Sequence, residues 1–204
     1  MGFFITFEGI EGCGKTTQAK KLYEYLNMLG FKTHLTKEPG GTLIGSEIRR
    51  ILLSQWEEKF PPIAELLLYE ADRSIHINNV IKPLLQQDYI VVSDRFYDST
   101  TAYQHYGRGI DYNFVDFLNK TVTEGLKPDI TFLLDISVEE AFKRLDRKKD
   151  RIENESLDFH RKVREGFLII AEKEKDRFII LDATKSPDDI FQEVLKALKE
   201  RKVI

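Results

Sequence analysis

Residues Gly9 to Thr16 carry the strongest chemical signal in the chain, because their types and spacing suit the binding of phosphate. The segment reads Gly-Ile-Glu-Gly-Cys-Gly-Lys-Thr, and four residues separate its first glycine from the glycine before Lys15. Glycines at these two places let backbone N–H groups converge on phosphate oxygens, while the lysine reaches the terminal phosphates. The hydroxyl of Thr16 suits the ligand shell of Mg²⁺. The pattern predicts that the chain binds a nucleoside triphosphate.

The sequence on either side of this loop argues against a chance match. An apolar, strand-like run, Phe3 to Phe7, precedes the loop, and a helical pattern over residues 15–29 follows it. A phosphate-binding loop needs this order, since the positive end of the helix dipole attracts the phosphate. The predicted triphosphate-binding residues are Gly9, Ile10, Glu11, Gly12, Cys13, Gly14, Lys15, Thr16 and Thr17. We interpret Cys13 as a small residue that fills a tight loop, with a redox-sensitive thiol as the alternative.

Short apolar runs alternate with helical patterns along the whole chain. The predicted strands are Phe3–Phe7, Thr33–Thr36, Tyr89–Ser93, Ile130–Asp135 and Phe178–Asp182. The predicted helices cover residues 15–29, 42–53, 62–87, 98–106, 111–124, 137–147, 155–175 and 187–201, and Pro83 should bend or end the third of them. Strands that are nearly all apolar suit a parallel sheet covered on both faces. The alternation predicts a doubly wound α/β fold, with ligands at the carboxyl ends of the strands.

Composition narrows the class of protein. The chain has 204 residues, the usual size of one domain, and a net charge of −3, which gives no sign of a broad nucleic-acid footprint. Its single cysteine fits a reducing compartment. No apolar stretch is long enough for a membrane span, and the chain enters a strand at once, which leaves no room for a signal peptide. We therefore expect a cytoplasmic enzyme without nucleic-acid or membrane partners.

Other nucleotide-binding classes fit less well. Switch GTPases read their base with an Asn-Lys-x-Asp run after a strand. Here the run Asn119-Lys120-Thr121-Val122 lacks the Asp and lies in a helical pattern. Motor proteins and helicases are usually longer. A small-molecule kinase remains the best interpretation of the phosphate loop.

A second group of polar motifs follows the later strands. Glu38-Pro39-Gly40-Gly41-Thr42, Asp94-Arg95-Phe96-Tyr97 and Asp182-Ala183-Thr184 each come where a predicted strand ends. On the long third helix, Tyr69 and Arg73 are four residues apart and share one face. A ring that stacks on a base and a guanidinium that reaches its edge would suit a nucleotide acceptor. Taken alone, such a pair is more often a half-buried ring beside a solvated charge.

Together these motifs resemble those of the bacterial thymidylate kinases, and the resemblance extends over essentially the whole chain. It rests on the phosphate loop, the Glu-Pro-Gly-Gly-Thr and Asp-Arg motifs, Ser99-Thr100-Thr101-Ala102-Tyr103-Gln104, Asp150-Arg151-Ile152-Glu153 and Asp182-Ala183-Thr184. The resemblance implies a three-layer P-loop kinase fold, with a five-stranded parallel sheet flanked by helices on both faces, as one domain over residues 1–204. It also implies that the γ-phosphoryl group of ATP, bound with Mg²⁺, passes to dTMP to give dTDP and ADP for dTTP synthesis. Members of the family are usually homodimers.

The resemblance also assigns roles to residues. The catalytic set it implies is Lys15, Glu11, Arg95, Arg147 and Arg151, and the metal-binding set is Thr16 and Asp94. The dTMP-binding set is Glu38, Pro39, Arg49, Tyr69, Arg73, Arg95, Ser99, Thr100, Tyr103 and Gln104. The family usually has Phe where this chain has Tyr69, and a tyrosine ring also stacks on a base. Asp94 would support the metal shell or orient Arg95, or it caps the following helix.

The charged run from Arg144 to Glu155 is the predicted lid. Charge spreads over the phosphoryl oxygens in the transition state, so a second cation is expected near the transferred group. The variable positions of the phosphate loop, Ile10 to Cys13, contain no basic residue that could provide it. Arg147 and Arg151 are therefore the candidates, as in the bacterial subclass, and the alternative for the run is a solvated helix end.

Two rival functions stay open at this stage. The acceptor could be another nucleoside monophosphate, which only the acceptor pocket decides. The chain could also be a nucleotide-binding switch that does not transfer phosphate efficiently. The acceptor arginines and the lid cations argue against the switch.

Overall fold

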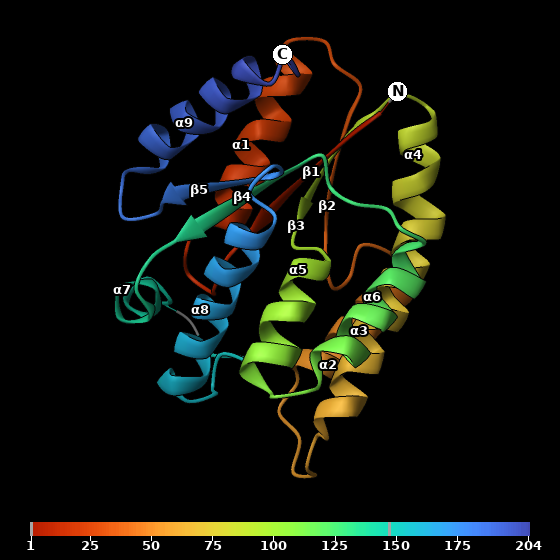
Figure 1. The fold of residues 1–204 in the computed structure, drawn as a ribbon, viewed down its shortest axis with the longest axis vertical. Helices are drawn as coiled ribbons and strands as arrows, with labels where there is room; N and C mark the ends of the chain where they lie inside the picture. The colour runs from red at the N-terminus through yellow and green to blue at the C-terminus, as the bar shows by residue number, and fades with distance from the viewer. Residues whose placement is uncertain (1, 147) are drawn as a thin grey trace.

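The computed structural model describes residues 2–146 and 148–204 and contains one five-stranded parallel sheet (Figure 1). Its strands are β1 (Phe3–Glu8), β2 (Thr33–Lys37), β3 (Ile90–Asp94), β4 (Ile130–Asp135) and β5 (Phe178–Asp182), in the order β2-β3-β1-β4-β5. The predicted parallel α/β sheet is confirmed. All five predicted strands are present, with ends within one residue of those expected.

Helices follow each strand, as predicted. They are α1 (Lys15–Met28), α2 (Leu43–Leu53), α3 (Pro62–His76), α4 (Lys82–Gln86), α5 (Tyr97–Thr100), α6 (Tyr112–Thr123), α7 (Val138–Lys143), α8 (Leu157–Lys173) and α9 (Pro187–Glu200). Helix α1 packs on the face of β1 that carries Ile5 and Phe7. Helix α4 packs on the opposite face, against Phe4 and Val91. The sheet is therefore covered on both sides, which explains why its strands are nearly all apolar.

Two segments expected as ordinary helix are wider, π-helical turns. The first, Ile77–Ile81, joins α3 to α4, and the second, Thr101–Gly107, continues α5. Pro83 does not end the long helix, which runs on to Gln86. A proline has no N–H for the helical ladder, and the chain widens its turn just before it. The second π-helical segment carries Tyr103 and Gln104, both predicted site residues, and such turns often occur at functional sites.

The strand order places the phosphate loop at the middle of the carboxyl edge. The central strand β1 pairs with β3, with Phe7 opposite Asp94, and β3 pairs with β2, with Lys37 opposite Asp94. The segments that leave β1, β3 and β2 therefore begin side by side. Parallel sheets bind ligands at this edge because the connecting loops meet there.

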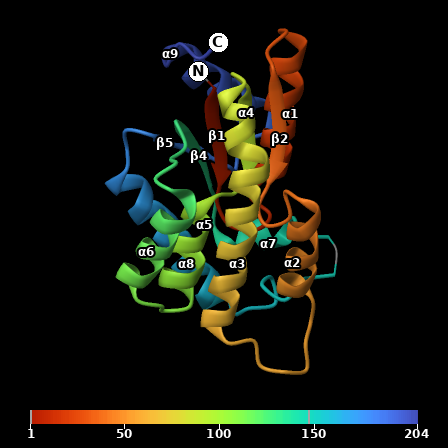
Figure 2. The ribbon, with the colours of Figure 1, turned by 90° about the vertical axis from the view of Figure 1, so that its right-hand side faces the viewer.

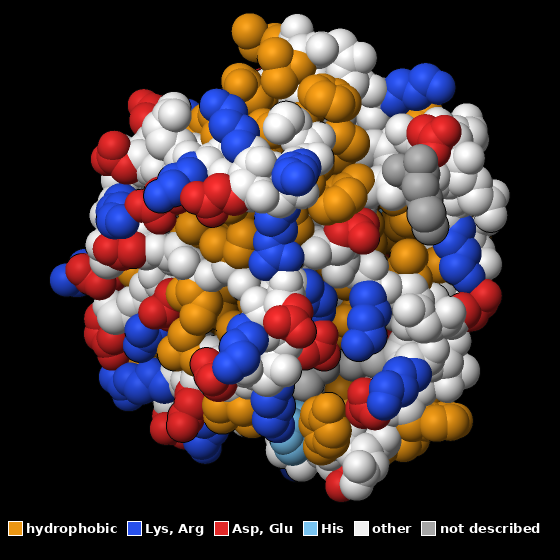
Figure 3. Space-filling view, turned by 45° about the horizontal axis from the view of Figure 1, so that its top comes forward, with side chains coloured by type: hydrophobic (Ala, Val, Ile, Leu, Met, Phe, Trp, Pro, Cys, Tyr) orange, Lys and Arg blue, Asp and Glu red, His pale blue; other side chains and the backbone are white. Residues whose placement is uncertain are grey.

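Within residues 2–146 and 148–204, no helix is both long and apolar enough to cross a bilayer. On the face shown in Figure 3, basic and acidic side chains are interspersed rather than gathered by sign. This mixture agrees with the small net charge of the chain.

Candidate active site

The phosphate loop has the backbone geometry that its glycines predict. Gly9, Gly12 and Gly14 have φ angles of 135°, 76° and 100°, which other residues rarely adopt. A Cβ atom at Gly12 would lie only 2.2 Å from the carbonyl oxygen of Ala141. Gly14 precedes α1 and has no side chain to cap it. The first N–H groups of α1 are therefore available to an anion.

Two loop side chains are held close to this backbone. The ammonium group of Lys15 donates a hydrogen bond of 2.7 Å to the carbonyl of Ile10, and it lies 3.5 Å from the sulfur of Cys13. Cys13 is completely buried, which agrees with its interpretation as a residue that fills the loop. Lys15 is thus folded over the loop where phosphate oxygens would be bound.

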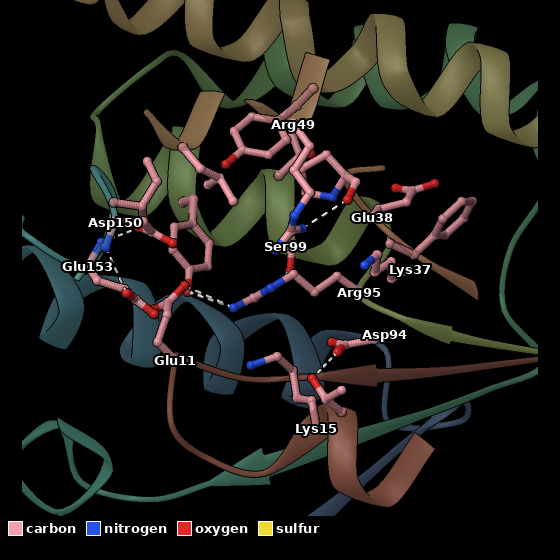
Figure 4. A pocket seen from close by; sticks show the side chains of 18 of the residues that line it. Glu11, Lys15, Lys37, Glu38, Arg49, Asp94, Arg95, Ser99, Asp150 and Glu153 are labelled. Atoms are coloured by element: carbon pink, nitrogen blue, oxygen red, sulfur yellow. Dashed lines mark hydrogen bonds and ion pairs between the residues drawn. The ribbon is translucent and has the colours of Figure 1, made fainter. Parts of the chain in front are cut away.

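Thr16, in the first turn of α1, contacts Asp94. The hydroxyl of Thr16 donates to a carboxylate oxygen of Asp94 (Figure 4). Hydroxyl and carboxylate oxygens are the donors that Mg²⁺ prefers, so this pair fits the predicted metal-binding role. No larger cluster of His, Cys, Asp or Glu suited to a metal occurs in the described part of the chain. A metal here would therefore take most of its other ligands from phosphate oxygens and water.

A cavity of about 290 Å³ opens beside the loop at the carboxyl edge of the sheet (Figure 4). Most of the predicted site residues line it: Glu11, Gly12, Lys15, Thr16, Glu38, Pro39, Arg49, Tyr69, Arg73, Asp94, Arg95, Ser99, Thr100, Tyr103 and Gln104. The other predicted triphosphate-binding residues do not line it: Gly9, Ile10, Cys13 and Gly14 belong to the loop, and Thr17 lies in the first turn of α1. Lys37, Leu53, Phe96, Asp150, Ile152 and Glu153 also line the cavity; the last three belong to the predicted lid, and none of the six was among the predicted catalytic or binding residues.

Arg95 connects the phosphate loop to the rest of the cavity. One of its terminal nitrogens donates to the carboxylate of Glu11 at 2.9 Å, and the other donates to the carbonyl of Gly9 at 3.0 Å and the hydroxyl of Ser99 at 2.9 Å. Its backbone φ of 76° turns the chain sharply after β3. Arg95 therefore reaches the loop from the neighbouring strand.

Glu11 is held ionised by its neighbours. Burial by itself would raise its pKa, but the charges of Arg95 and Lys15 and a hydrogen bond from Tyr103 outweigh it and lower the pKa. The Tyr103 hydroxyl donates to the same oxygen, Oε1, at 2.6 Å. A carboxylate next to a phosphate site is electrostatically costly, and these contacts keep it charged there.

The far wall of the cavity is a buried network around Arg73. Arg73 donates to Glu38 at 2.8 Å, to Glu70 at 2.6 Å and to Thr100 at 2.9 Å, and only 2% of its surface is exposed. The other oxygen of Glu38 bonds the ring of His76 at 2.9 Å. The structure thus brings together Arg73 and Thr100, two residues of the predicted dTMP-binding set.

Because Gly41 has no side chain, the ring of His76 can pack against its backbone. A Cβ atom at Gly41 would lie 2.4 Å from Nε2 of His76, well inside normal contact. The same Nε2 bonds the hydroxyl of Thr36 at 2.6 Å. The second glycine of the Glu-Pro-Gly-Gly motif is therefore required by the packing of a buried side chain. Another part of the motif, the Pro39 carbonyl, accepts a bond of 2.9 Å from Arg49.

Arg151 is engaged away from the cavity. Its guanidinium pairs with Glu65 at 2.7 Å and donates to the carbonyl of Leu52 at 2.7 Å, and it lies over the ring of Phe60. It is not among the residues that line the cavity. Glu65 also accepts from Gln104 at 2.9 Å. Arg147, the other predicted lid cation, lies outside the described residues.

Glu8 does not line the cavity but bonds two residues that do, and it was not among the predicted site residues. It is the last residue of β1 and is completely buried. Its carboxylate accepts from the backbone N–H of Phe96 at 2.8 Å and from the hydroxyl of Ser99 at 2.6 Å. Burial, with a smaller effect from Asp98, raises the pKa of Glu8 to about 8. A lone carboxylate at the end of an apolar strand was the available signal.

Comparison with known proteins shows to which family the chain is similar. The sequence model of the thymidylate kinase family matches residues 7–194. A protein named thymidylate kinase from Sulfurihydrogenibium sp. (strain YO3AOP1) is 60% identical over 204 residues, which cover 100% of both chains. A thymidylate kinase from Geotalea daltonii is 51% identical over 198 residues, covering 93% of this chain and 92% of that protein. The crystal structure of thymidylate kinase from Ehrlichia chaffeensis is similar with a TM-score of 0.79 and 38% identity, and covers 98% of this chain and 100% of its own.

The raised pKa of Glu8 predicts a pH-dependent difference between the wild-type protein and Glu8→Gln. Above the pKa of about 4.5 that Glu8 has when exposed, the unfolded chain releases this proton while the folded chain keeps it up to about pH 8. The free energy of unfolding of the wild type should therefore fall as the pH rises from 5 to 9, relative to that of Glu8→Gln, which cannot ionise. Urea unfolding at several pH values measures the difference.

Glu139→Gln is the matched control, because Glu139 is an exposed carboxylate whose pKa is lowered by its hydrogen bond with Arg161. Its difference from the wild type should not grow over the same pH range. A constant difference for Glu8→Gln as well would contradict the raised pKa.

Proposed function

The chain belongs to the thymidylate kinase family, an ATP-dependent phosphotransferase family, and we propose that its cavity transfers the γ-phosphoryl group of ATP to dTMP, giving dTDP and ADP for dTTP synthesis. The observation that carries this proposal is the contact between Glu11 and Arg95. Glu11 belongs to the loop for the donor, and Arg95 lines the cavity for the acceptor. This contact marks the place where donor and acceptor phosphates would meet.

On the donor side, the loop and Lys15 bind the phosphates of ATP. The free N–H groups at the start of α1 add to this binding. Thr16 and Asp94 would hold Mg²⁺, which neutralises charge on the phosphate oxygens when it is bound. The fit of these two side chains to a hard cation supports the assignment.

On the acceptor side, Arg49 and Arg95 hold the phosphate of dTMP. Their planar guanidinium groups suit contact with two phosphate oxygens at once. The ring of Tyr69 stacks on thymine, and Tyr103 lies beside the deoxyribose, where it disfavours a 2′-hydroxyl. The base edge faces the buried wall formed by Arg73, Thr100 and Gln104, in which Glu38 accepts from Arg73. Pro39 and Ser99 instead bond the phosphate-binding arginines Arg49 and Arg95. The position of all these residues around one cavity supports this division of roles.

Catalysis in this arrangement depends on positioning and on charge. Phosphoryl transfer needs little covalent help from a protein, so the enzyme aligns the two substrates and stabilises the negative charge. Arg95 and Lys15 supply positive charge on either side of the reacting phosphate. Glu11, kept ionised, orients the acceptor through its sugar 3′-hydroxyl.

Steady-state transfer from MgATP to dTMP, dUMP, dGMP, dCMP and AMP tests the proposed function. We expect kcat/KM for dTMP to exceed that for each other acceptor by about tenfold or more, the size of effect that about 1.4 kcal/mol of differential binding gives. Faster turnover of another monophosphate would keep the chemistry and reject the base-reading roles. Absence of transfer to all five would favour a nucleotide-binding switch.

The segment over residues 144–155 is proposed to close over ATP and to bring a cation to the γ-phosphate. Arg147→Ala should lower kcat by about tenfold or more with little change in the KM for ATP, since the lost charge acts in the transition state. Arg151→Ala, measured in the same way, shows which of the two arginines supplies the cation, since the one that does should lose kcat when it is replaced. In this structure the Arg151 guanidinium is bound to Glu65 and to the Leu52 carbonyl. Full kcat in both variants would reject the lid cation.

Assembly as a homodimer is a further part of the proposal. Figure 2 shows α3 lying between α6 and α2. Exposed apolar side chains on α3 and α6, Ile63, Leu67, Phe114 and Phe117, support these helices as the surface for a second copy. Sedimentation velocity should show a dimer that Leu67→Glu converts to monomer, while Met28→Glu, an exposed apolar position at the end of α1, leaves it unchanged. A monomeric wild type would reject the dimer.

A cytoplasmic location stays a prediction.

A further inference from the structure

His160 is a completely buried side chain that the roles above do not use. It lies in the first turn of α8, directly after the predicted lid, and 0% of its surface is exposed. Neither of its ring nitrogens makes a hydrogen bond of normal geometry to any described residue. Buried polar atoms are nearly always paired in native proteins, so an unpaired imidazole next to a catalytic cavity needs a physical reason.

The ring faces the oxygen of Glu11 that has no partner. Nδ1 of His160 lies 3.6 Å from Oε2 of Glu11. That oxygen is also buried without a hydrogen bond, whereas Oε1 accepts from both Arg95 and Tyr103. The separation exceeds a normal hydrogen bond by about half an ångström. An approach of that size would satisfy both groups.

The surroundings of the ring keep it a neutral donor. Burial lowers the pKa of His160, and Lys149 adds to this, while Glu11, Glu155 and the carbonyl of Ile152 oppose it. The rings of Phe142 and Phe159 lie 4.6 Å and 5.2 Å from the imidazole and limit its movement. Two acceptors lie near the ring, the carbonyl of Ile152 and Oε2 of Glu11. The Ile152 carbonyl already accepts from the backbone N–H of Glu155 at 3.0 Å, whereas Oε2 of Glu11 has no other hydrogen bond. A neutral imidazole with its proton on Nδ1 can donate one hydrogen bond, and Glu11 is the acceptor that lacks one.

We propose that His160 is a positioning residue that donates from Nδ1 to Oε2 of Glu11. With Oε1 held by Arg95 and Tyr103, the second bond fixes the rotation of the carboxylate and so the direction in which it meets the acceptor. The inference rests on the proposed function, because an acceptor sugar gives Glu11 something to orient. The bond also connects the phosphate loop to the helix that begins where the lid ends.

Two substitutions test this role with dTMP and MgATP as substrates. His160→Phe keeps an aromatic ring in the site and removes the donor, and it should lower kcat by about tenfold with the KM for ATP changed less than about twofold. His160→Gln retains an N–H donor and should recover part of the loss. Val163→Ala is the matched control, because it opens a cavity in the same helix, one turn from His160, and leaves the imidazole and the rings around it unchanged; it should lower the melting temperature and keep kcat.

A double-mutant cycle with Glu11→Gln shows whether His160 acts through Glu11. In the Glu11→Gln background, His160→Phe should cause no further loss of kcat. An equal loss in both backgrounds, or full kcat in His160→Phe, overturns the positioning role. If His160→Phe does not fold, the pair His160→Leu and His160→Gln makes the same comparison of a side chain without a donor and one with it.

The same assays separate the two proposals. A wild-type protein that transfers phosphate to none of the five monophosphates would overturn the proposed function, and this inference with it. An active wild type with an equally active His160→Phe variant overturns this inference alone.

Discussion

The ion pair of Arg95 and Glu11 is the contact on which the rest of the cavity depends. It joins the loop after β1 to the segment after β3, and both partners are largely buried. The same guanidinium also bonds Gly9 and Ser99, so one side chain sets the spacing between the donor loop and the acceptor wall. Breaking a buried pair from one side leaves a charge without compensation, which makes this spacing hard to change.

Two sets of buried hydrogen bonds support this pair and the cavity around it. Glu8 holds Ser99 from inside the sheet, and Ser99 in turn bonds Arg95. On the other side, the Arg73 network bonds Glu38 and Thr100 with no solvent between them. Substrate-binding side chains whose rotamers are fixed in this way lose little further conformational entropy when they bind. The cavity is therefore organised by the protein itself.

Much of this arrangement could be predicted from the sequence. The strands were identified because runs such as Phe3 to Phe7 are nearly all apolar, and parallel pairing then brings their carboxyl ends together. The phosphate loop and the strand-end motifs identified most of the residues that line the cavity. These signals are local, since each depends on residue types within a few positions.

The features that sequence could not predict arise from contacts across the fold. Nothing in the sequence around Arg151 indicates that it pairs with Glu65, because the two are brought together only when the lid packs on α3. The π-helical turn at Thr101–Gly107 has no distinct apolar period, so it was expected to be an ordinary helix. Glu8 and His160 were missed for a related reason: a single polar residue does not reveal whether it will be buried.

The contact between Gly41 and His76 has a consequence for how this protein can change over evolutionary time. The glycine leaves the volume that the imidazole fills, and the imidazole supports Glu38. A larger residue at position 41 is therefore admissible only together with a smaller one at position 76, which would leave Glu38 without one of its two partners. The two positions can therefore change only together, although they lie far apart in the sequence.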